Sequence, residues 1–307
     1  MQIKEYHFPS ATGVCEIYGN TYTADDGQYN AVLVIHHGMA EHQERYIDFI
    51  NYLTSNGFCV YMNDMANHGR SNQDYSLTGY FGEKDGYKAL VEDLNTTFKK
   101  AKEENPDKKI FVMGHSMGSF ITRCFTAWHN DAGFEAAIYM GTGGTNPMAA
   151  LGDRVSGLVA KIKGCSSKSK LLDSMAFGSY NKQFEGRTNY DWLTRDTNIV
   201  DKYIADRYCG FLFSAQGMND LIKLNIAANT DEWYKAVPDV PILLISGDKD
   251  PVGDYSKGIL EVGDKLKKSG HTKVDVKLFK NARHEVLNEI NRQDVYEYVK
   301  NFLQSYI

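Results

Sequence analysis

Short apolar runs alternate with longer amphipathic segments along most of this chain of 307 residues. The apolar runs occupy residues 31–35, 58–62, 110–113, 136–140, 242–245 and 274–279. Most of them contain too few polar residues for one face to lie in water, which is typical of parallel strands covered on both sides. The alternation therefore predicts an α/β fold with a mostly parallel, doubly wound sheet and right-handed crossovers.

Three segments between or after these runs have the apolar periodicity of helices. Their apolar stripes are Tyr46, Phe49, Ile50 and Leu53; Leu90, Val91, Leu94, Phe98 and Ala101; and Val295, Tyr298, Val299, Phe302 and Leu303. Gly57 is expected to end the first helix, and the second is expected to stop before Pro106. The stretches KEYHF and VCEIYGNTY in the first 30 residues predict an antiparallel hairpin at the sheet edge.

The strand–helix alternation is interrupted between about Gly141 and Val237. This segment is too long for a loop, and it contains helix-like stretches. It is rich in large apolar residues: Met148, Leu151, Met175, Phe177, Phe184, Trp192, Phe211, Phe213 and Met218. We expect residues 142–235 to form a helical cap over the sheet, and residues 1–141 and 236–307 to form the α/β core.

Charge and cysteine usage exclude several classes of protein. The net charge is −5 and the lysines are scattered, which argues against nucleic acid as a partner. The N-terminus has no basic stretch followed by an apolar core, and no run reaches the length of a membrane-spanning helix. The five cysteines are far apart and lack any C-x-x-C pair, so we expect reduced thiols in a cytoplasmic protein, without a zinc site or disulfides.

One serine lies between two glycines directly after the run 110–113. The sequence GHSMG fits the pattern G-x-S-x-G, in which a strand turns sharply into a helix and exposes the serine hydroxyl. We expect Gly114 to permit the turn and Gly118 to let the helix pack close to the sheet. Ser116 is the predicted nucleophile, and the N–H of Met117 is predicted to donate to an oxyanion beside it.

A second oxyanion donor is expected in the loop after the run 31–35. There the sequence VLVIHHGMAEHQERY offers the N–H of Met39, with Gly38 allowing the turn. We interpret His36, His37 and His42 as non-metal residues, because no carboxylate or cysteine with ligand spacing accompanies them.

The general base is predicted to follow the serine and the acid in the chain. His271 precedes the strand 274–279 and is expected at the wrong edge of the sheet. His284 follows that strand, at the carboxyl edge where the chemistry of open α/β sheets gathers. His284 is therefore the predicted base.

The acid that orients this base is expected just after the run 242–245, in SGDKDPVGD. Asp248, Asp250 and Asp254 compete for the role. Asp250 is favoured because Gly247 lets the chain turn and Pro251 stiffens it, and Asp248 is the second choice.

Four segments in order, HHGMAEHQERY, GHSMG, SGDKDPVGD and ARHEVLNE, resemble the monoacylglycerol lipase and lysophospholipase branch of the α/β-hydrolases. This branch includes serine aminopeptidase-like hydrolases, and the resemblance covers essentially the whole chain. It implies the α/β-hydrolase fold with a helical cap. One difference is Asn67 in DMANHGRS, where the family usually has D-x-x-G-H-G-x-S. We expect that loop to be structural and the change to affect at most one wall of the pocket.

The sequence therefore predicts a serine esterase with the triad Ser116, Asp250 and His284, acting through an acyl-enzyme without metal or organic cofactor. The resemblance implies monoacylglycerols, lysophospholipids or related acyl esters as substrates. Two alternatives stay open, a capped serine peptidase or amidase and a small-molecule binding module with vestigial activity. The nucleophile is serine, which excludes the haloalkane and epoxide chemistry of aspartyl relatives. Beyond the small-molecule substrate we expect no nucleic acid and no stable membrane insertion, while transient lipid contact through the cap stays open.

Overall fold

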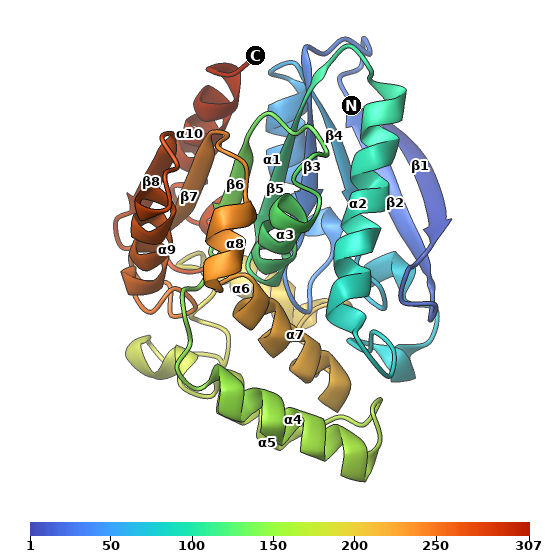
Figure 1. The fold of residues 1–307 in the computed structure, drawn as a ribbon, viewed down its shortest axis with the longest axis vertical. Coiled ribbons are helices and arrows are strands. Elements are labelled where there is room, and N and C mark those ends of the chain that lie inside the picture. The colour runs from blue at the N-terminus through green and yellow to red at the C-terminus, as the bar shows by residue number, and fades with distance from the viewer.

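The computed structural model describes residues 1–307, and its eight strands form one sheet in the order β1-β2-β4-β3-β5-β6-β7-β8 (Figure 1). The strands are β1 (Gln2–Pro9), β2 (Glu16–Thr23), β3 (Ala31–His36), β4 (Phe58–Asn63), β5 (Lys109–His115), β6 (Ala137–Met140), β7 (Ile242–Gly247) and β8 (Val274–Phe279). β1 pairs antiparallel with β2 and β2 with β4, whereas the other neighbours are parallel. The predicted fold class and edge hairpin are confirmed.

The sheet is covered by helices on both faces. The helices are α1 (Ile47–Thr54), α2 (Gly86–Glu104), α3 (Met117–Trp128), α4 (Ala149–Lys163), α5 (Lys170–Phe177), α6 (Thr197–Ala205), α7 (Ala215–Ala227), α8 (Asp231–Ala236), α9 (Lys257–Lys268) and α10 (Arg292–Gln304). Short 3₁₀ turns are η1 (Gln43–Tyr46), η2 (Gly69–Ser71), η3 (Tyr75–Leu77), η4 (Tyr180–Gln183) and η5 (Val286–Asn288).

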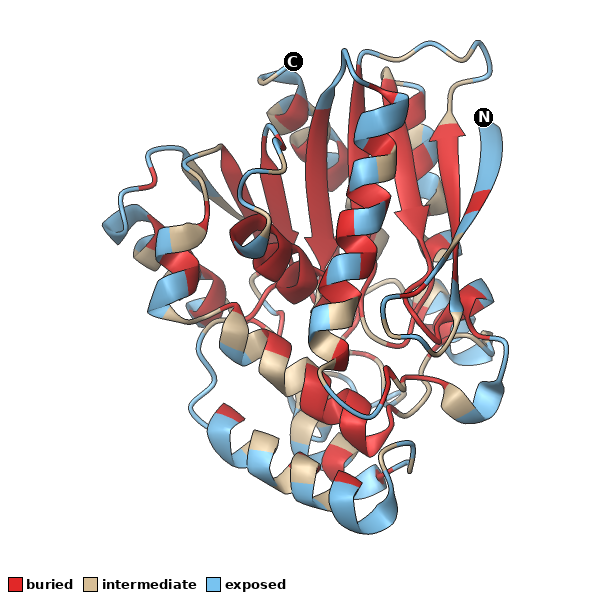
Figure 2. Ribbon diagram, turned by 45° about the vertical axis from the view of Figure 1, so that its right-hand side comes forward, coloured by how far each residue is buried: buried red, intermediate tan, exposed pale blue.

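Two apolar cores, one on each face, hold these layers together. The larger core joins the sheet to α2, α3, α8 and α9, and the smaller joins it to α1 and α10. The central strands are buried along almost their whole length, as the red strands in Figure 2 show. This burial explains why their sequences are continuous apolar runs rather than alternating ones.

The three predicted helices correspond to α1, α2 and α10, but α9 is an element that the sequence reasoning missed. Its buried stripe consists of Ile259, Val262 and Leu266, separated by lysines and acidic residues. The spacing of three and four residues was the available signal.

The segment between β6 and β7 contains α4 to α8. In Figure 1, α4, α5, α6 and α7 lie below the sheet, whereas α8 lies beside α3. The buried guanidinium of Arg123 in α3 connects both ends of this insertion to the core. It donates to the Gly143 carbonyl at 3.0 Å and to Asn229 Oδ1 at 3.0 Å, and it also bonds the Ala228 carbonyl. The exact boundaries of the cap, 142–235, remain a prediction.

Candidate active site

Ser116 lies at the sharp connection between β5 and α3. Its φ of 54° and ψ of −122° place the backbone in a region that non-glycine residues rarely adopt, at a cost of about 1–3 kcal/mol. Gly114 was expected to permit this turn, but the positive φ of the turn belongs to the serine itself. A Cβ on Gly114 would instead overlap the Gly118 carbonyl, and one on Gly118 would overlap the carbonyls of β3 and the following loop. Both glycines therefore serve the close approach of α3 to the sheet.

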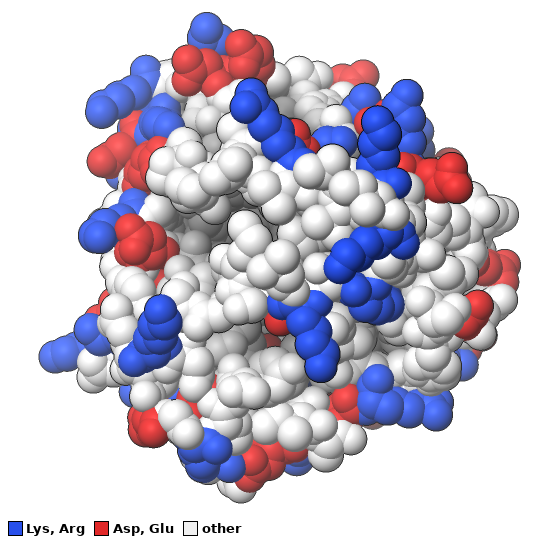
Figure 3. Space-filling model, turned by 90° about the horizontal axis from the view of Figure 1, so that it is seen from below, with Lys and Arg blue, Asp and Glu red and all other residues white.

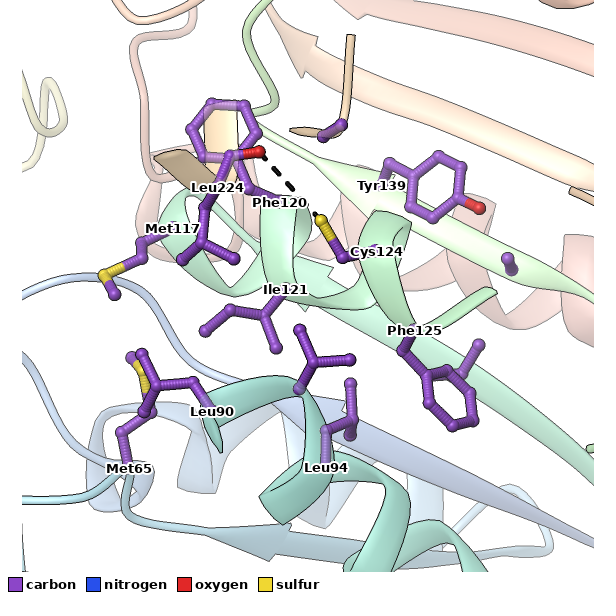
Figure 4. Packing of buried hydrophobic residues seen from close by; sticks show 14 of the residues in the cluster. Met65, Leu90, Leu94, Met117, Phe120, Ile121, Cys124, Phe125, Tyr139 and Leu224 are labelled. Atoms are coloured by element: carbon purple, nitrogen blue, oxygen red, sulfur yellow. Dashed lines mark hydrogen bonds between the residues drawn. The ribbon is translucent and has the colours of Figure 1, made fainter. Parts of the chain in front are cut away.

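Helix α3 is fixed by packing along its whole buried side. In Figure 4, Ile121 lies above Leu90 and Leu94 of α2, and Cys124 lies between Tyr139 and Leu224. Almost every α3 residue is buried. This packing holds the strained backbone of Ser116 in place.

Asp250 and His284 form the pair that was predicted to activate the serine. His284 Nδ1 lies 2.9 Å from Asp250 Oδ1, and both side chains are buried. Ser246 Oγ and the Val252 N–H also donate to this carboxylate, each at 2.9 Å. Asp248 instead accepts a hydrogen bond from the backbone N–H of Asn281 in an exposed turn. Among the three candidate aspartates, Asp250 is the one that contacts His284.

Ser116 and His284 line the same cavity, although no hydrogen bond joins their side chains in this structure. Such bonds are often long before substrate binds. The rings of His115 and Trp192 lie 4.7 Å and 5.2 Å from the His284 ring and enclose it. His271 lies at the opposite edge, where its Nε2 is 3.1 Å from the Tyr234 carbonyl.

The two predicted oxyanion donors, the N–H groups of Met39 and Met117, make no hydrogen bond within the protein. The loop that carries Met39 lies against the serine, because a Cβ on Gly38 would be 3.1 Å from Ser116 Cβ. Gly38 was expected to allow the turn of this loop, and its left-handed residue is Ala40, with φ 51°. Gly38 is required for the close approach to Ser116.

Behind the loop lies a buried charge network that the sequence reasoning did not identify. Glu41 Oε2 accepts from Arg45 at 2.6 Å, and Glu41 Oε1 accepts from Tyr46 Oη at 2.8 Å and lies 3.2 Å from His115 Nδ1. Arg45 also forms two 2.6 Å bonds to Glu285. The spacing of four residues between Glu41 and Arg45 was a signal for an ion pair.

This network changes the pKa values of its members. Burial disfavours the ionised form of Glu41, but the His115 hydrogen bond and the Arg45 charge outweigh it, so the pKa of Glu41 lies well below its usual range. Burial also disfavours the charged form of His115, yet Glu41 raises the pKa of this imidazole. Glu41 is therefore a carboxylate at neutral pH.

A cavity of about 820 Å³ opens beside Ser116. Many of the apolar cap residues singled out in the sequence line it: Met148, Met175, Phe177, Trp192, Phe211 and Met218. Leu151, Phe184 and Phe213 do not. Seen from the cap side, the surface is hollowed and mostly uncharged in its central part (Figure 3). The cavity has the size of a small-molecule site, and apolar cap side chains form part of its mixed lining.

Asn67 does not line this cavity, so it alters no wall of the pocket, where at most one was expected to change. Its φ is 54°, so it adopts the left-handed conformation that a glycine would adopt easily and that asparagine tolerates. Its side chain donates to the Tyr80 carbonyl at 2.6 Å. The substitution therefore preserves the loop.

The histidines near Met39 have different surroundings. Burial lowers the pKa of His36 to about 4 and holds the pKa of His37 well below its ordinary value.

His42 Nε2 is 2.8 Å from Asp206 Oδ2, and the Cys209 sulfur lies within 4.8 Å of both atoms. The sequence reasoning found no carboxylate or cysteine near these histidines because Asp206 and Cys209 come from the distant cap. His42, Asp206 and Cys209 are the group whose spacing would suit a metal ion.

The site belongs to a chain with many relatives. A sequence model described as serine aminopeptidase, S33, matches residues 27–291. A monoacylglycerol lipase of Mycolicibacterium smegmatis is 26% identical over 99% of this chain and 98% of its own length. A phospholipase of Bacillus subtilis, YtpA, is 23% identical over 90% of this chain and 96% of its own length.

Solved structures agree with this grouping. A thermostable carboxyl esterase from Bacillus coagulans superposes with a TM-score of 0.93 and 29% identity, covering 100% of this chain and 99% of its own. No helix of the present structure is long and apolar enough to cross a membrane. The strand order, the serine between β5 and α3 and the family match together show that the chain belongs to the serine aminopeptidase S33 family of α/β-hydrolases.

Proposed function

We propose that this protein hydrolyses carboxylic esters of monoacylglycerols or related acyl esters through an acyl-enzyme on Ser116. The observation that carries the proposal is the buried Asp250–His284 hydrogen bond in the same cavity as Ser116. The unpartnered N–H groups of Met39 and Met117 give this arrangement a place for an oxyanion.

The reaction begins when Ser116 Oγ attacks the ester carbonyl carbon and its proton passes to His284 Nε2. Asp250 accepts the hydrogen bond from Nδ1–H and stabilises the imidazolium. Met39 and Met117 donate to the tetrahedral oxyanion. His284 then gives its proton to the departing alkoxide, and the alcohol leaves. A water molecule, deprotonated by His284, attacks the acyl-enzyme and releases the acid and free Ser116.

An acyl chain suits the cavity better than a peptide does. Methionine and aromatic side chains of the cap line much of it, and flexible methionines adapt to chains of varied shape. The similar proteins named above are a monoacylglycerol lipase, a phospholipase and a carboxyl esterase. Residues 142–235 act as the cap in this proposal, and residues 1–141 with 236–307 act as the catalytic core.

The outer face of the cap supports transient contact with lipid aggregates that contain the substrate. Large apolar side chains that do not line the cavity are exposed on α4 and α5: Leu151, Leu158, Ile162 and Leu171. All five cysteines are free thiols, which supports the proposed cytoplasmic location.

A hydrolysis panel tests the function. It compares short- and long-chain p-nitrophenyl esters, monoacylglycerols, lysophospholipids and aminoacyl anilides, with Ser116→Ala as the control. We expect the wild-type protein to hydrolyse the esters and not the anilides, and the control to lose kcat by several orders of magnitude, roughly 10⁶-fold if the triad acts as a unit.

Fluorophosphonate labelling separates catalysis from binding. We expect a covalent adduct on Ser116 of the wild-type protein and none on the Ser116→Ala variant. A wild-type protein that binds acyl esters without forming the adduct would be a binding module, and preference for the anilides would make it a peptidase or amidase.

A further inference from the structure

The three consecutive backbone N–H groups of the loop 38–40 have different partners. The Gly38 N–H donates to Glu41 Oε1 at 2.6 Å, and the Ala40 N–H donates to His68 Nε2 at 3.3 Å. Only the middle donor, the N–H of Met39, has no partner within the protein. Side chains therefore occupy two of the three N–H groups of this loop and leave the N–H of Met39 free.

The peptide that carries the Met39 N–H is fixed from its other side. His37 Nδ1 lies 2.8 Å from the Gly38 carbonyl oxygen, which belongs to the same peptide group. Because a trans peptide directs its C=O and N–H to opposite sides, this bond sets the direction of the Met39 N–H. A flipped peptide would turn the Gly38 carbonyl toward the oxyanion in place of the donor.

Both histidines are held in one tautomer by the loop of DMANHGRS. The Met65 N–H donates to His37 Nε2 at 2.8 Å, so the proton of His37 is on Nδ1. His68 Nδ1 lies 3.0 Å from the Ala66 carbonyl, so the proton of His68 is also on Nδ1 and Nε2 accepts from Ala40. Two adjacent loop residues, Met65 and Ala66, thereby determine which nitrogen of each ring donates and which accepts.

The surroundings of His68 keep it neutral and fixed. The side chain is fully buried, and its ring lies 5.9, 5.0 and 5.4 Å from the rings of Phe81, Phe211 and Phe213. Burial lowers the pKa of His68 to about 4, so its Nε2 remains an acceptor near neutral pH. The His37 ring lies 5.4 Å away.

We propose that His37 and His68 are positioning residues of the oxyanion hole, which hold the backbone of residues 38–40 so that the Met39 N–H faces Ser116. The loop of DMANHGRS, interpreted from its sequence as structural only, acts on catalysis through them. This inference rests on the proposed function, in which Met39 is an oxyanion donor.

Matched variants of His68 test the hydrogen bond to Ala40. His68→Phe keeps a ring of similar shape and removes the acceptor, whereas His68→Gln places an amide oxygen near the position of Nε2. We measure kcat and KM on a p-nitrophenyl ester, the Ki of a trifluoromethyl ketone whose adduct with Ser116 needs the oxyanion donors, and thermal unfolding. His36→Phe is the control, since His36 is an equally buried neighbour whose ring makes one hydrogen bond, at 3.3 Å to the His37 carbonyl.

We expect His68→Phe to lower kcat roughly 10- to 100-fold, less than the loss of a whole donor, with little change in KM. The Ki of the trifluoromethyl ketone is expected to rise by the same factor, and His68→Gln to recover most of both losses. The control is expected to keep kcat within about threefold, because a buried side chain away from the reacting atoms changes stability more than rate.

Three results would overturn the inference: an unchanged Ki when kcat falls, a His68→Gln variant as slow as His68→Phe, or an equal loss in the control. If His68→Phe does not fold, His37→Asn and His37→Leu test the hydrogen bond from His37 Nδ1 to the Gly38 carbonyl instead. Only the asparagine variant keeps a donor near the position of Nδ1. Equal kcat and Ki in those two variants would also contradict the inference. Failure of the proposed function is distinct, since the wild-type protein itself would then lack Ser116-dependent hydrolysis.

Discussion

The two terminal nitrogens of Arg45 each lie 2.6 Å from one oxygen of the Glu285 carboxylate. Glu285 directly follows the predicted base His284, and Arg45 also binds Glu41, whose other oxygen accepts from the Gly38 N–H. This bidentate pair joins the loop of the base to the oxyanion loop, although 240 positions separate its two residues.

Removing Arg45 is expected to destabilise the fold strongly. Arg45→Met would leave two buried carboxylates, Glu41 and Glu285, without their shared cation, and breaking a buried pair costs about 3–5 kcal/mol. Urea unfolding measures the free energy of unfolding. The control is Arg187→Met, which breaks an exposed 2.6 Å pair with Asp201 and is expected to cost less than about 1 kcal/mol. Equal losses of unfolding free energy in the two variants would mean that burial of the Arg45 ion pairs does not increase the cost of breaking them.

The choice among the aspartates predicts opposite outcomes for two isosteric changes. Asp250→Asn is expected to lower kcat on the order of 10⁴-fold, because the amide cannot hold the His284 imidazole in its required tautomer. Asp248→Asn removes only the charge of a group bonded to the Asn281 N–H in an exposed turn, and kcat is expected to stay near the wild-type value. Steady-state kinetics on one ester decides between them. A large loss of kcat in Asp248→Asn with little change in Asp250→Asn would identify Asp248 as the acid that orients His284.

The backbone strain at Ser116 predicts a difference between two inactive variants. Ser116→Gly should be more stable than Ser116→Ala by about 1–3 kcal/mol, because glycine adopts positive φ without the Cβ penalty. Both variants lack the hydroxyl, so the difference between their free energies of unfolding reports the backbone strain at position 116. Thermal and urea unfolding measure it, and an alanine variant of equal or greater stability would show that the strain is absent.

Asp220 in α7 predicts a dependence of stability on pH. One oxygen accepts from the Tyr87 N–H at 3.1 Å, the other has no partner, and burial raises the pKa of this carboxyl to about 7. A raised pKa means that the folded state holds the proton more tightly. The stabilisation of the folded state by protonated Asp220 is therefore fully present below the unfolded pKa of about 4, and it is lost as pH rises through the folded pKa of about 7.

Asp220→Asn keeps an acceptor for Tyr87 and removes this titration. The stability of the variant relative to the wild type is expected to increase by about 2–3 kcal/mol between pH 5 and pH 8. Urea unfolding at both pH values measures the difference, with the exposed Asp107→Asn as the control. A difference that stays constant with pH would indicate that Asp220 does not titrate in this range.

Local pattern predicted much of the fold. All six apolar runs are strands, because a strand buried on both faces needs side chains that tolerate complete removal from water. The stripe of α9 was overlooked since lysines and acidic residues dominate its composition. Gly38 and Gly114 were expected to allow turns, and Gly118 a close approach of helix and sheet. In the structure Gly38 and Gly118 permit close approaches between segments that are distant in sequence, whereas Gly114 leaves room for the Gly118 carbonyl of the following helix.

The sequence by itself determined the order of the motifs, the identity of the serine and the edge of the sheet where His284 lies, because these follow from chain order and strand direction. Only the tertiary structure decided which partners meet. It brought Glu285 to Arg45 and the 64–71 loop to the residues around Met39. Buried hydrogen bonds and ion pairs depend on distances of about 3 Å in three dimensions, and spacing along the chain does not encode them.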